Sequence, residues 1–149
     1  MKDNNFGTNG VNLNELFYIG VVTSYGETPG TVKITRPDKD DRVSADLPVI
    51  QLCVKDNQFF HMPQINEQVL VLQLPNAGGK GVCDGYVLGA FYNEVDTSIE
   101  QNNKVYLLRM KDGCYIRFDG EGNIELHATK KFFVTVGEQV RINKGKGRY

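Results

Sequence analysis

The chain has 149 residues, with 17 Lys and Arg against 18 Asp and Glu, so its formal net charge is −1. This balance argues against a general binder of polyanions and leaves room only for a local basic patch. Its 16 glycines, its lack of tryptophan and the absence of apolar residues at helical spacing predict an all-β chain, long enough for one domain and an appendage.

The N-terminal segment and the cysteines indicate where the protein is made. Residues 1–16 are polar and rich in Asn and Gly, and we interpret them as a flexible arm, with an arm that orders on a partner as the alternative. They lack the apolar core of a signal peptide, and no stretch of the chain approaches the roughly 18 apolar residues of a membrane span. The cysteines have no C-x-x-C spacing and predict reduced thiols rather than disulfides or a zinc site: Cys53, Cys83 and Cys114. We therefore expect cytoplasmic synthesis, with release by lysis or within a particle.

Five strand regions are expected between residues 17 and 93, and their spacing after a long first strand is typical of an OB-type barrel. The regions are Phe17–Tyr25, Gly30–Thr35, Val43–Leu52, Gln68–Leu74 and Gly81–Tyr92. Gly20 within the first region predicts a bend or a bulge, as the closure of a small barrel needs. The fourth region is apolar enough to predict burial on both of its faces.

Three short motifs in this region resemble phage baseplate assembly protein V and related spike proteins. Residues Met62–Val71, MPQINEQVLV, are similar to the family signature MPEIGEQVLV; residues Gly85–Asn93, GYVLGAFYN, resemble the GYVLGALYN that closes the same barrel; and Leu47–Val49 resembles part of the motif WLPV. Asn66 stands where the family usually has Gly, and Asn also tolerates the left-handed backbone that such a turn needs. The resemblance covers residues 17–93, and its motif positions are Met62, Pro63, Asn66, Val69, Gly85, Gly89 and Tyr92.

This resemblance implies an OB-fold barrel followed by a trimeric β-helical needle. The relatives are the spikes of contractile phages, R-type bacteriocins and type VI secretion, in which sheath contraction drives the spike through a cell envelope. The implied partners are two further copies of the chain, a hub protein at the end of the tail tube, other baseplate proteins and the target cell envelope. The protein would then be a component of a phage tail or a phage-tail-like particle.

The tail of the chain carries a repeat of eight residues. After a polar linker at residues 94–103, we expect the stem and tip at residues 104–149. Apolar residues occupy two octad positions that are two residues apart, and turn sequences at Asp112-Gly113, Gly120–Asn123 and Gly137 separate the pairs. The apolar residues of the repeat are Leu108, Met110, Ile116, Phe118, Ile124, Leu126, Phe132, Val134, Val140 and Ile142. This alternation predicts strands with one apolar and one polar face.

The length of the repeat indicates how the apolar face is covered. Eight extended residues reach roughly 26 Å, which is one side of a prism, so a single copy of the tail cannot enclose its own apolar face. Three copies, one per side, would close the prism and leave no free strand edge. We therefore expect a short trimeric, intertwined β-prism with the apolar residues in its interior. The alternative is a five-stranded antiparallel meander packed on the rest of the chain.

The C-terminal end is basic, through Arg141, Lys144, Lys146 and Arg148. In a trimer these charges would gather at the tip and attract the anionic phosphates of a target surface, whereas the alternative is an ordinary solvated terminus. Many members of the family that the chain resembles carry an apical His-x-His that binds iron, but no second histidine follows His127 here. We expect no metal or other cofactor, and either a separate capping protein or the chain's own terminus would close the tip.

The sequence contains no catalytic constellation, and we expect a non-enzymatic protein: the central, membrane-piercing spike of a contractile tail. His61 lies next to aromatic residues before a turn, where a structural role is expected. The alternative function is binding of single-stranded nucleic acid by an OB-fold, through aromatic and basic residues such as Tyr18, Tyr25 and Lys33. The net charge and the octad tail argue against this alternative.

Overall fold

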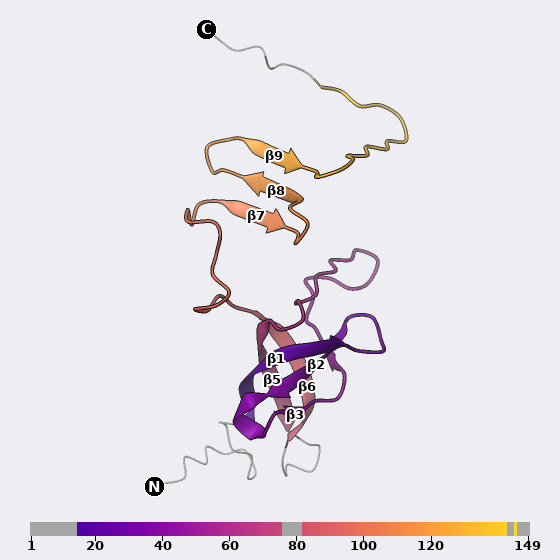
Figure 1. Ribbon diagram of the computed structural model, residues 1–149. Helices are drawn as coiled ribbons and strands as arrows, with labels where there is room; N and C mark the ends of the chain where they lie inside the picture. Colours follow the sequence, from indigo (N-terminus) through magenta and orange to yellow (C-terminus); the bar gives the residue numbers. More distant parts are fainter. Residues whose placement is uncertain (1–14, 76–81, 143–144, 146–149) are drawn as a thin grey trace. The chain divides into compact units, whose positions relative to one another are not determined.

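The computed structural model describes residues 15–75, 82–142 and 145, and it divides the chain into two compact units, Met1–Thr97 and Ser98–Tyr149 (Figure 1). Within the described ranges the regular structure is nine strands in two antiparallel sheets, which confirms the prediction of an all-β chain. No helix in these ranges has the length and apolar character that crossing a membrane requires. The predicted arm at residues 1–16 lies almost entirely outside the described residues.

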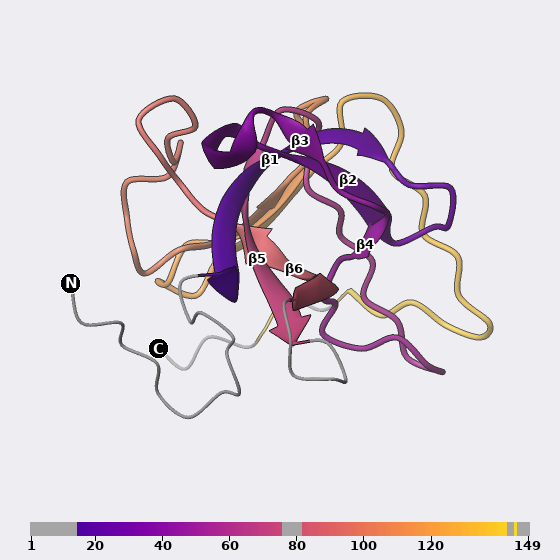
Figure 2. The same ribbon diagram turned by 90° about the horizontal axis from the view of Figure 1, so that it is seen from below.

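The first unit is a sheet that closes on itself. Its strands are β1 (Phe17–Tyr25), β2 (Thr31–Arg36), β3 (Arg42–Val43), β4 (Leu47–Pro48), β5 (Gln68–Pro75) and β6 (Val82–Ala90). The strand order is β3-β2-β1-β5-β6, and β4 pairs with β2. A parallel bridge between Val49 and Val87 joins the chain after β4 to β6, so the strands form a ring (Figure 2).

The interior of this ring is filled by the alternate residues that point inward. The buried apolar side chains are Tyr18, Val22, Val32, Ile34, Leu47, Val69, Val71 and Val87, and Val49 and Met62 pack against them. In β5 only Val69 and Val71 are buried, whereas Leu70 and Leu74 are exposed. The prediction that this strand is buried on both faces is therefore wrong, because successive β5 side chains point alternately into the core and away from it.

Glycines allow close contacts between strands at two places. The bulge in β1 lies between Val22 and Ser24, so the prediction of a bend at Gly20 itself places it a few residues early. Glycine is needed at position 20 for a different reason, because a Cβ there would collide with the side chain of Ile34 on β2. Gly85 on β6 lies equally close to the main chain of Leu72 on β5. Both strands can therefore approach their neighbours only without a side chain at these points.

The turn that leads into β5 has a left-handed residue where the sequence predicted one. Asn66 has φ 73°, and its N–H donates to the carbonyl of Val22 at 2.8 Å. We expect Asn66→Gly to keep the stability of the barrel, whereas Asn66→Val should lower it by roughly 1–2 kcal/mol, because a β-branched residue is strained in this region. Urea unfolding of the two variants measures the difference, and equal stability of both would contradict this explanation of the turn.

Between β4 and β5 the chain forms a projecting hairpin, which we call hairpin 50–61. The predicted third strand was expected to continue to Leu52, but β4 ends at Pro48, and after the bridge from Val49 to Val87 the chain enters this hairpin. A bridge between Val54 and Gln58 and a hydrogen bond from the N–H of Phe59 to the carbonyl of Cys53 (3.0 Å) hold its two arms together. Several of its exposed side chains are large and apolar, among them Leu52, Val54 and Phe60.

The second unit contains a three-stranded antiparallel sheet of β7 (Tyr106–Arg109), β8 (Tyr115–Phe118) and β9 (Ile124–His127), in that order. Gly113, Gly120 and Gly122 have φ values of 93°, 79° and 101° in the turns between these strands. The turns at these glycines were predicted from the repeat and are confirmed. Residues 128–142 carry the later apolar pairs of the repeat, but they form no strand within the described chain.

Candidate functional site

The candidate site is the apolar face of the second unit, which we call the stem face. Cross-strand pairing builds it in rows. Leu108 on β7 lies opposite Ile116 on β8, and Ile116 lies opposite Leu126 on β9. Because side chains alternate between the faces of a strand, the pair Phe118 and Ile124 extends the same face by a second row.

The stem face is exposed in the single chain. Its least exposed member, Ile116, keeps 38% of its surface accessible, and Ile142 keeps 92%. All ten apolar residues predicted to fill the prism interior are exposed: Leu108, Met110, Ile116, Phe118, Ile124, Leu126, Phe132, Val134, Val140 and Ile142. The face is hollowed by a depression of about 290 Å³ whose lining includes Met110 and Phe132. Exposed apolar surfaces of this extent are typical of sites that bind a protein, a ligand or a membrane.

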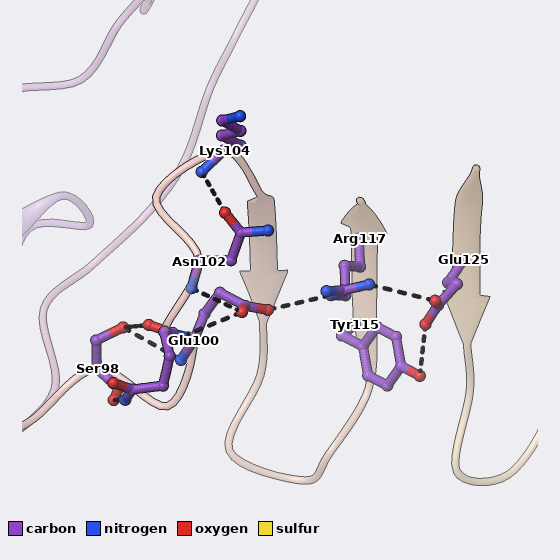
Figure 3. A network of polar contacts seen from close by, with 8 residues as sticks. Ser98, Glu100, Asn102, Lys104, Tyr115, Arg117 and Glu125 are labelled. Atoms are coloured by element: carbon purple, nitrogen blue, oxygen red, sulfur yellow. Dashed lines mark hydrogen bonds and ion pairs between the residues drawn. The ribbon is translucent and has the colours of Figure 1, made fainter. Parts of the chain in front are cut away.

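The opposite face of the same sheet is polar, and its groups bind one another. Arg117 on β8 donates from Nε to Glu100 (3.1 Å) and from Nη1 to Glu125 on β9 (3.4 Å) (Figure 3). The hydroxyl of Tyr115 donates to the other oxygen of Glu125 at 3.3 Å, and the Tyr115 ring stacks on His127 with centroids 5.1 Å apart. These polar side chains are therefore paired with one another within the single chain.

Glu100 ties the segment before β7 to this polar face. Its carboxylate accepts hydrogen bonds from the N–H groups of Gln101 and Asn102, both at 3.1 Å, in addition to the bond from Arg117 (Figure 3). The Asn102 N–H and the Arg117 guanidinium favour the charged carboxylate, so they lower the pKa of Glu100 below its usual range. Residues 98–104 are thus fixed next to the middle strand through one carboxylate.

The turn between β8 and β9 is held by the carboxylate of Asp119, and its contacts predict a low pKa for this group. The side-chain amide of Asn123 and the N–H groups of Glu121 and Asn123 donate to this carboxylate and lower its pKa from 3.8 to about 2. A lowered pKa means that the turn is stabilised above about pH 3.8 and loses this stabilisation as the pH falls through about 2. NMR titration of the Asp119 carboxyl should give the low value, and Asn123→Ala should raise it. An Asp119 that titrates near 3.8 in the unsubstituted protein would contradict the contacts.

The other predicted site residues are distributed as follows. Of the basic tip residues, Arg141 is described and donates from Nε to Gln139 at 3.0 Å, whereas Lys144, Lys146 and Arg148 lie outside the described residues. Among the motif positions, Pro63, Val69 and Gly85 are buried, Met62 packs on the core, Asn66 and Gly89 have positive φ, and Tyr92 is exposed. These motif residues therefore form the barrel and its turns rather than one surface site.

The residues considered for nucleic-acid binding do not form a platform for bases. Tyr18 is buried beneath Arg36, whose guanidinium carbon lies 3.9 Å from the ring centroid. Lys33 forms an ion pair with Asp46 at 3.6 Å, so its charge is partly neutralised. Of the three residues, Tyr25 has the exposed ring, with 48% of its surface accessible. Base stacking needs accessible aromatic faces, and Tyr18 offers none.

The histidines hold structural positions. The side-chain amide of Gln51 binds the main chain of His61. It accepts a hydrogen bond from the His61 N–H and donates one to the His61 carbonyl, both at 2.8 Å. His127 stacks on Tyr115 on the polar face. In the described part of the chain, no group of three His, Cys, Asp or Glu side chains is placed to hold a metal ion. Comparison with models of known protein families and with curated proteins finds no match to this chain.

Proposed function

We propose that three copies of this chain assemble through their stem faces into the central spike of a contractile tail or tail-like particle. The observation that carries the proposal is the stem face itself: a repeat of apolar side chains that the chain leaves exposed. In the assembly each β7–β9 sheet forms one side of a prism, with its apolar face inward and its polar face outward. The interior is then dry, and the outer surface is already internally paired.

The free energy of this burial is large enough to drive assembly. A half-exposed leucine or isoleucine that becomes fully buried contributes roughly 1 kcal/mol, so the ten residues together contribute on the order of 10 kcal/mol per chain. This matches the entire folding stability of many single domains, about 5–15 kcal/mol. Residues 128–142 add to it, because the main chain of this segment forms no strand within one copy and gains strand partners from the other two.

A closed prism suits a mechanical role. Strands that are paired on both sides have no free edge from which to unfold, and a dry interior resists bending. The first unit, in this proposal an OB-fold barrel, would join the stem to a hub protein at the end of the tail tube. This assignment draws on the resemblance of residues 17–93 to the baseplate assembly protein V family, and it makes the protein a non-enzymatic piercing tip.

The native mass in solution tests the proposal. At micromolar concentration we expect the full chain to sediment at three times its mass of 16.7 kDa, and we expect no salt-dependent binding of single-stranded DNA. A chain shortened after Asn103 keeps the barrel core but lacks the stem face, so its mass should fall toward that of a monomer. A full chain that is monomeric would overturn the trimeric spike, and a DNA shift that salt abolishes would favour the nucleic-acid-binding alternative.

A further inference from the structure

We propose that hairpin 50–61 of one copy packs on the outer face of strands β1, β5 and β6 of the next copy, around the threefold axis. This inference rests on the trimer proposed above and adds a second contact, between the barrels. It names a donor element and an acceptor surface that are both present in every chain.

The acceptor is an apolar patch on the outside of the barrel, which we call the sheet face. Strand pairing places Phe17 opposite Leu72, and Leu72 opposite Tyr86. The next row along the strands pairs Ile19 with Leu70. Phe17 and Ile19 each keep about half of their surface accessible, and Tyr86 is 41% exposed. The sheet face thus presents large apolar side chains on three adjacent strands, outside the core, and no other described segment of the unit buries them.

The donor is a hairpin that is already shaped for contact. Leu52 is 85% exposed, Val54 72% and Phe60 68%, although the hairpin itself is ordered by main-chain bonds. The Gln51 amide clamps the main chain of His61 across the base of the two arms. An element that is fixed before binding loses less conformational entropy on docking, so its apolar side chains contribute more to affinity.

Threefold symmetry explains why donor and acceptor differ. A twofold dimer joins a patch to the same patch, whereas a ring of three joins one surface of each copy to a different surface of the next. The barrel carries two apolar surfaces that its own core leaves exposed, the hairpin and the sheet face. In a head-to-tail ring, the hairpin of each copy covers the sheet face of the next, so both apolar surfaces are buried in every copy.

The size of the contact fits copies that are already held together. Burying the hairpin tip on the sheet face removes on the order of 1,000 Å² from water, the lower limit for a stable interface between free proteins. Copies joined through their stems meet at an effective concentration in the millimolar range for short connections, so a contact of this size suffices. The connection here runs only from Phe91 to Val105, between β6 and β7.

Cys53 provides a natural probe for the contact, because it lies on the hairpin and is exposed. In the full chain, Cys83→Ser and Cys114→Ser leave it as the single thiol, and Ile19→Cys adds a second thiol on the sheet face. After treatment with a short bismaleimide crosslinker, we expect loss of the monomer band on a denaturing gel and the appearance of covalent dimers and trimers. The matched control carries Lys39→Cys, in the 3₁₀ turn Pro37–Lys39, in place of Ile19→Cys and should stay monomeric on the gel.

A second substitution separates docking from simple proximity. Phe60→Asp in the two-thiol protein should abolish the covalent trimer while the native mass stays trimeric. Val95→Asp, at an exposed valine outside the hairpin, should change neither the crosslinking nor the native mass. A trimeric native mass with crosslinking no greater than in the Lys39→Cys control overturns this inference and leaves the trimeric stem standing. A monomeric native mass overturns the proposed function and this inference with it.

Discussion

Replacing Ile116 by aspartate is expected to convert the proposed trimer into a monomer of 16.7 kDa. Ile116 lies at the centre of the stem face, between Leu108 and Leu126, and in the proposed prism it points toward the threefold axis. Three carboxylates would meet there without cationic partners. An uncompensated buried charge costs about 3–5 kcal/mol in each copy, and the lost isoleucine removes roughly 1 kcal/mol more, so about half of the burial free energy of each chain is cancelled. The remainder must also offset the translational and rotational freedom lost on association, about 4–15 kcal/mol. Sedimentation at micromolar concentration measures the result.

The matched control is His127→Asp, which adds the same carboxylate to the opposite, polar face of the sheet. His127 is exposed and stacks on Tyr115, so this variant should lose one ring contact and keep the trimeric mass. If both variants stay trimeric, the stem face does not hold the copies together. If both become monomeric, the charge acts on the folding of the sheet rather than on its association.

Replacing Ile34 by alanine should lower the stability of the barrel by about 2–5 kcal/mol, the range for removing a large aliphatic side chain from a core. Ile34 has no accessible surface, and its neighbours Val22 and Val32 are equally buried, so the space left behind stays empty. Native-state hydrogen exchange at the Val22 amide, which donates to the Glu67 carbonyl at 3.0 Å, reports the change.

Ile99→Ala serves as the comparison, because Ile99 is 61% exposed and belongs to the second unit. We expect Val22 to exchange at the same rate in this variant as in the unsubstituted protein, since surface substitutions rarely change stability by more than about 0.5 kcal/mol. An effect of Ile34→Ala no larger than that of Ile99→Ala would mean that the ring of strands is not packed around a common core.

The alternation of apolar residues was sufficient to predict most strands of the first unit and the three strands β7, β8 and β9, because burial on one face leaves a clear period of two. The last two apolar pairs of the repeat, in residues 128–142, form no strand in the described chain. The first, second, fourth and fifth predicted regions match β1, β2, β5 and β6 within a few residues. The turns were equally visible, since Gly113 and Gly120 adopt the backbone angles that favour glycine. Asn66 shows that a departure from a resembled motif can still keep the same local geometry.

Burial on the second face of a strand could not be read from the sequence. Within the run QVLVLQL the four consecutive residues VLVL are all apolar, and the outward side chains Leu70 and Leu74 are as apolar as the inward ones. The sequence therefore suggested two buried faces, where the single chain has one. Leu70 belongs to the sheet face, so the excess of apolar residues that misled the prediction coincides with the surface proposed to bind the hairpin of the next copy.

Hairpin 50–61 was missed because its order depends on contacts that are distant in sequence. The Gln51 side chain binds the main-chain N–H and carbonyl of His61, and any residue except proline at position 61 would offer the same groups. One signal was available: apolar residues flank the turn-forming Lys55–Asn57 on both sides. The link from Glu100 to Arg117 was hidden for the same reason, since seventeen positions separate two ordinary surface charges.

The strands of the second unit pair only with their neighbours in sequence, across short turns. Such local hairpins close in about 1–10 μs, whereas encounters between separate chains depend on concentration and take far longer. A newly made chain can therefore complete this sheet before it meets other copies, and in the proposed trimer the apolar face stays exposed to solvent until two further copies bind. At high expression, assembly of the proposed spike would compete with nonspecific aggregation, so the yield of assembled spikes would depend on how fast the copies associate.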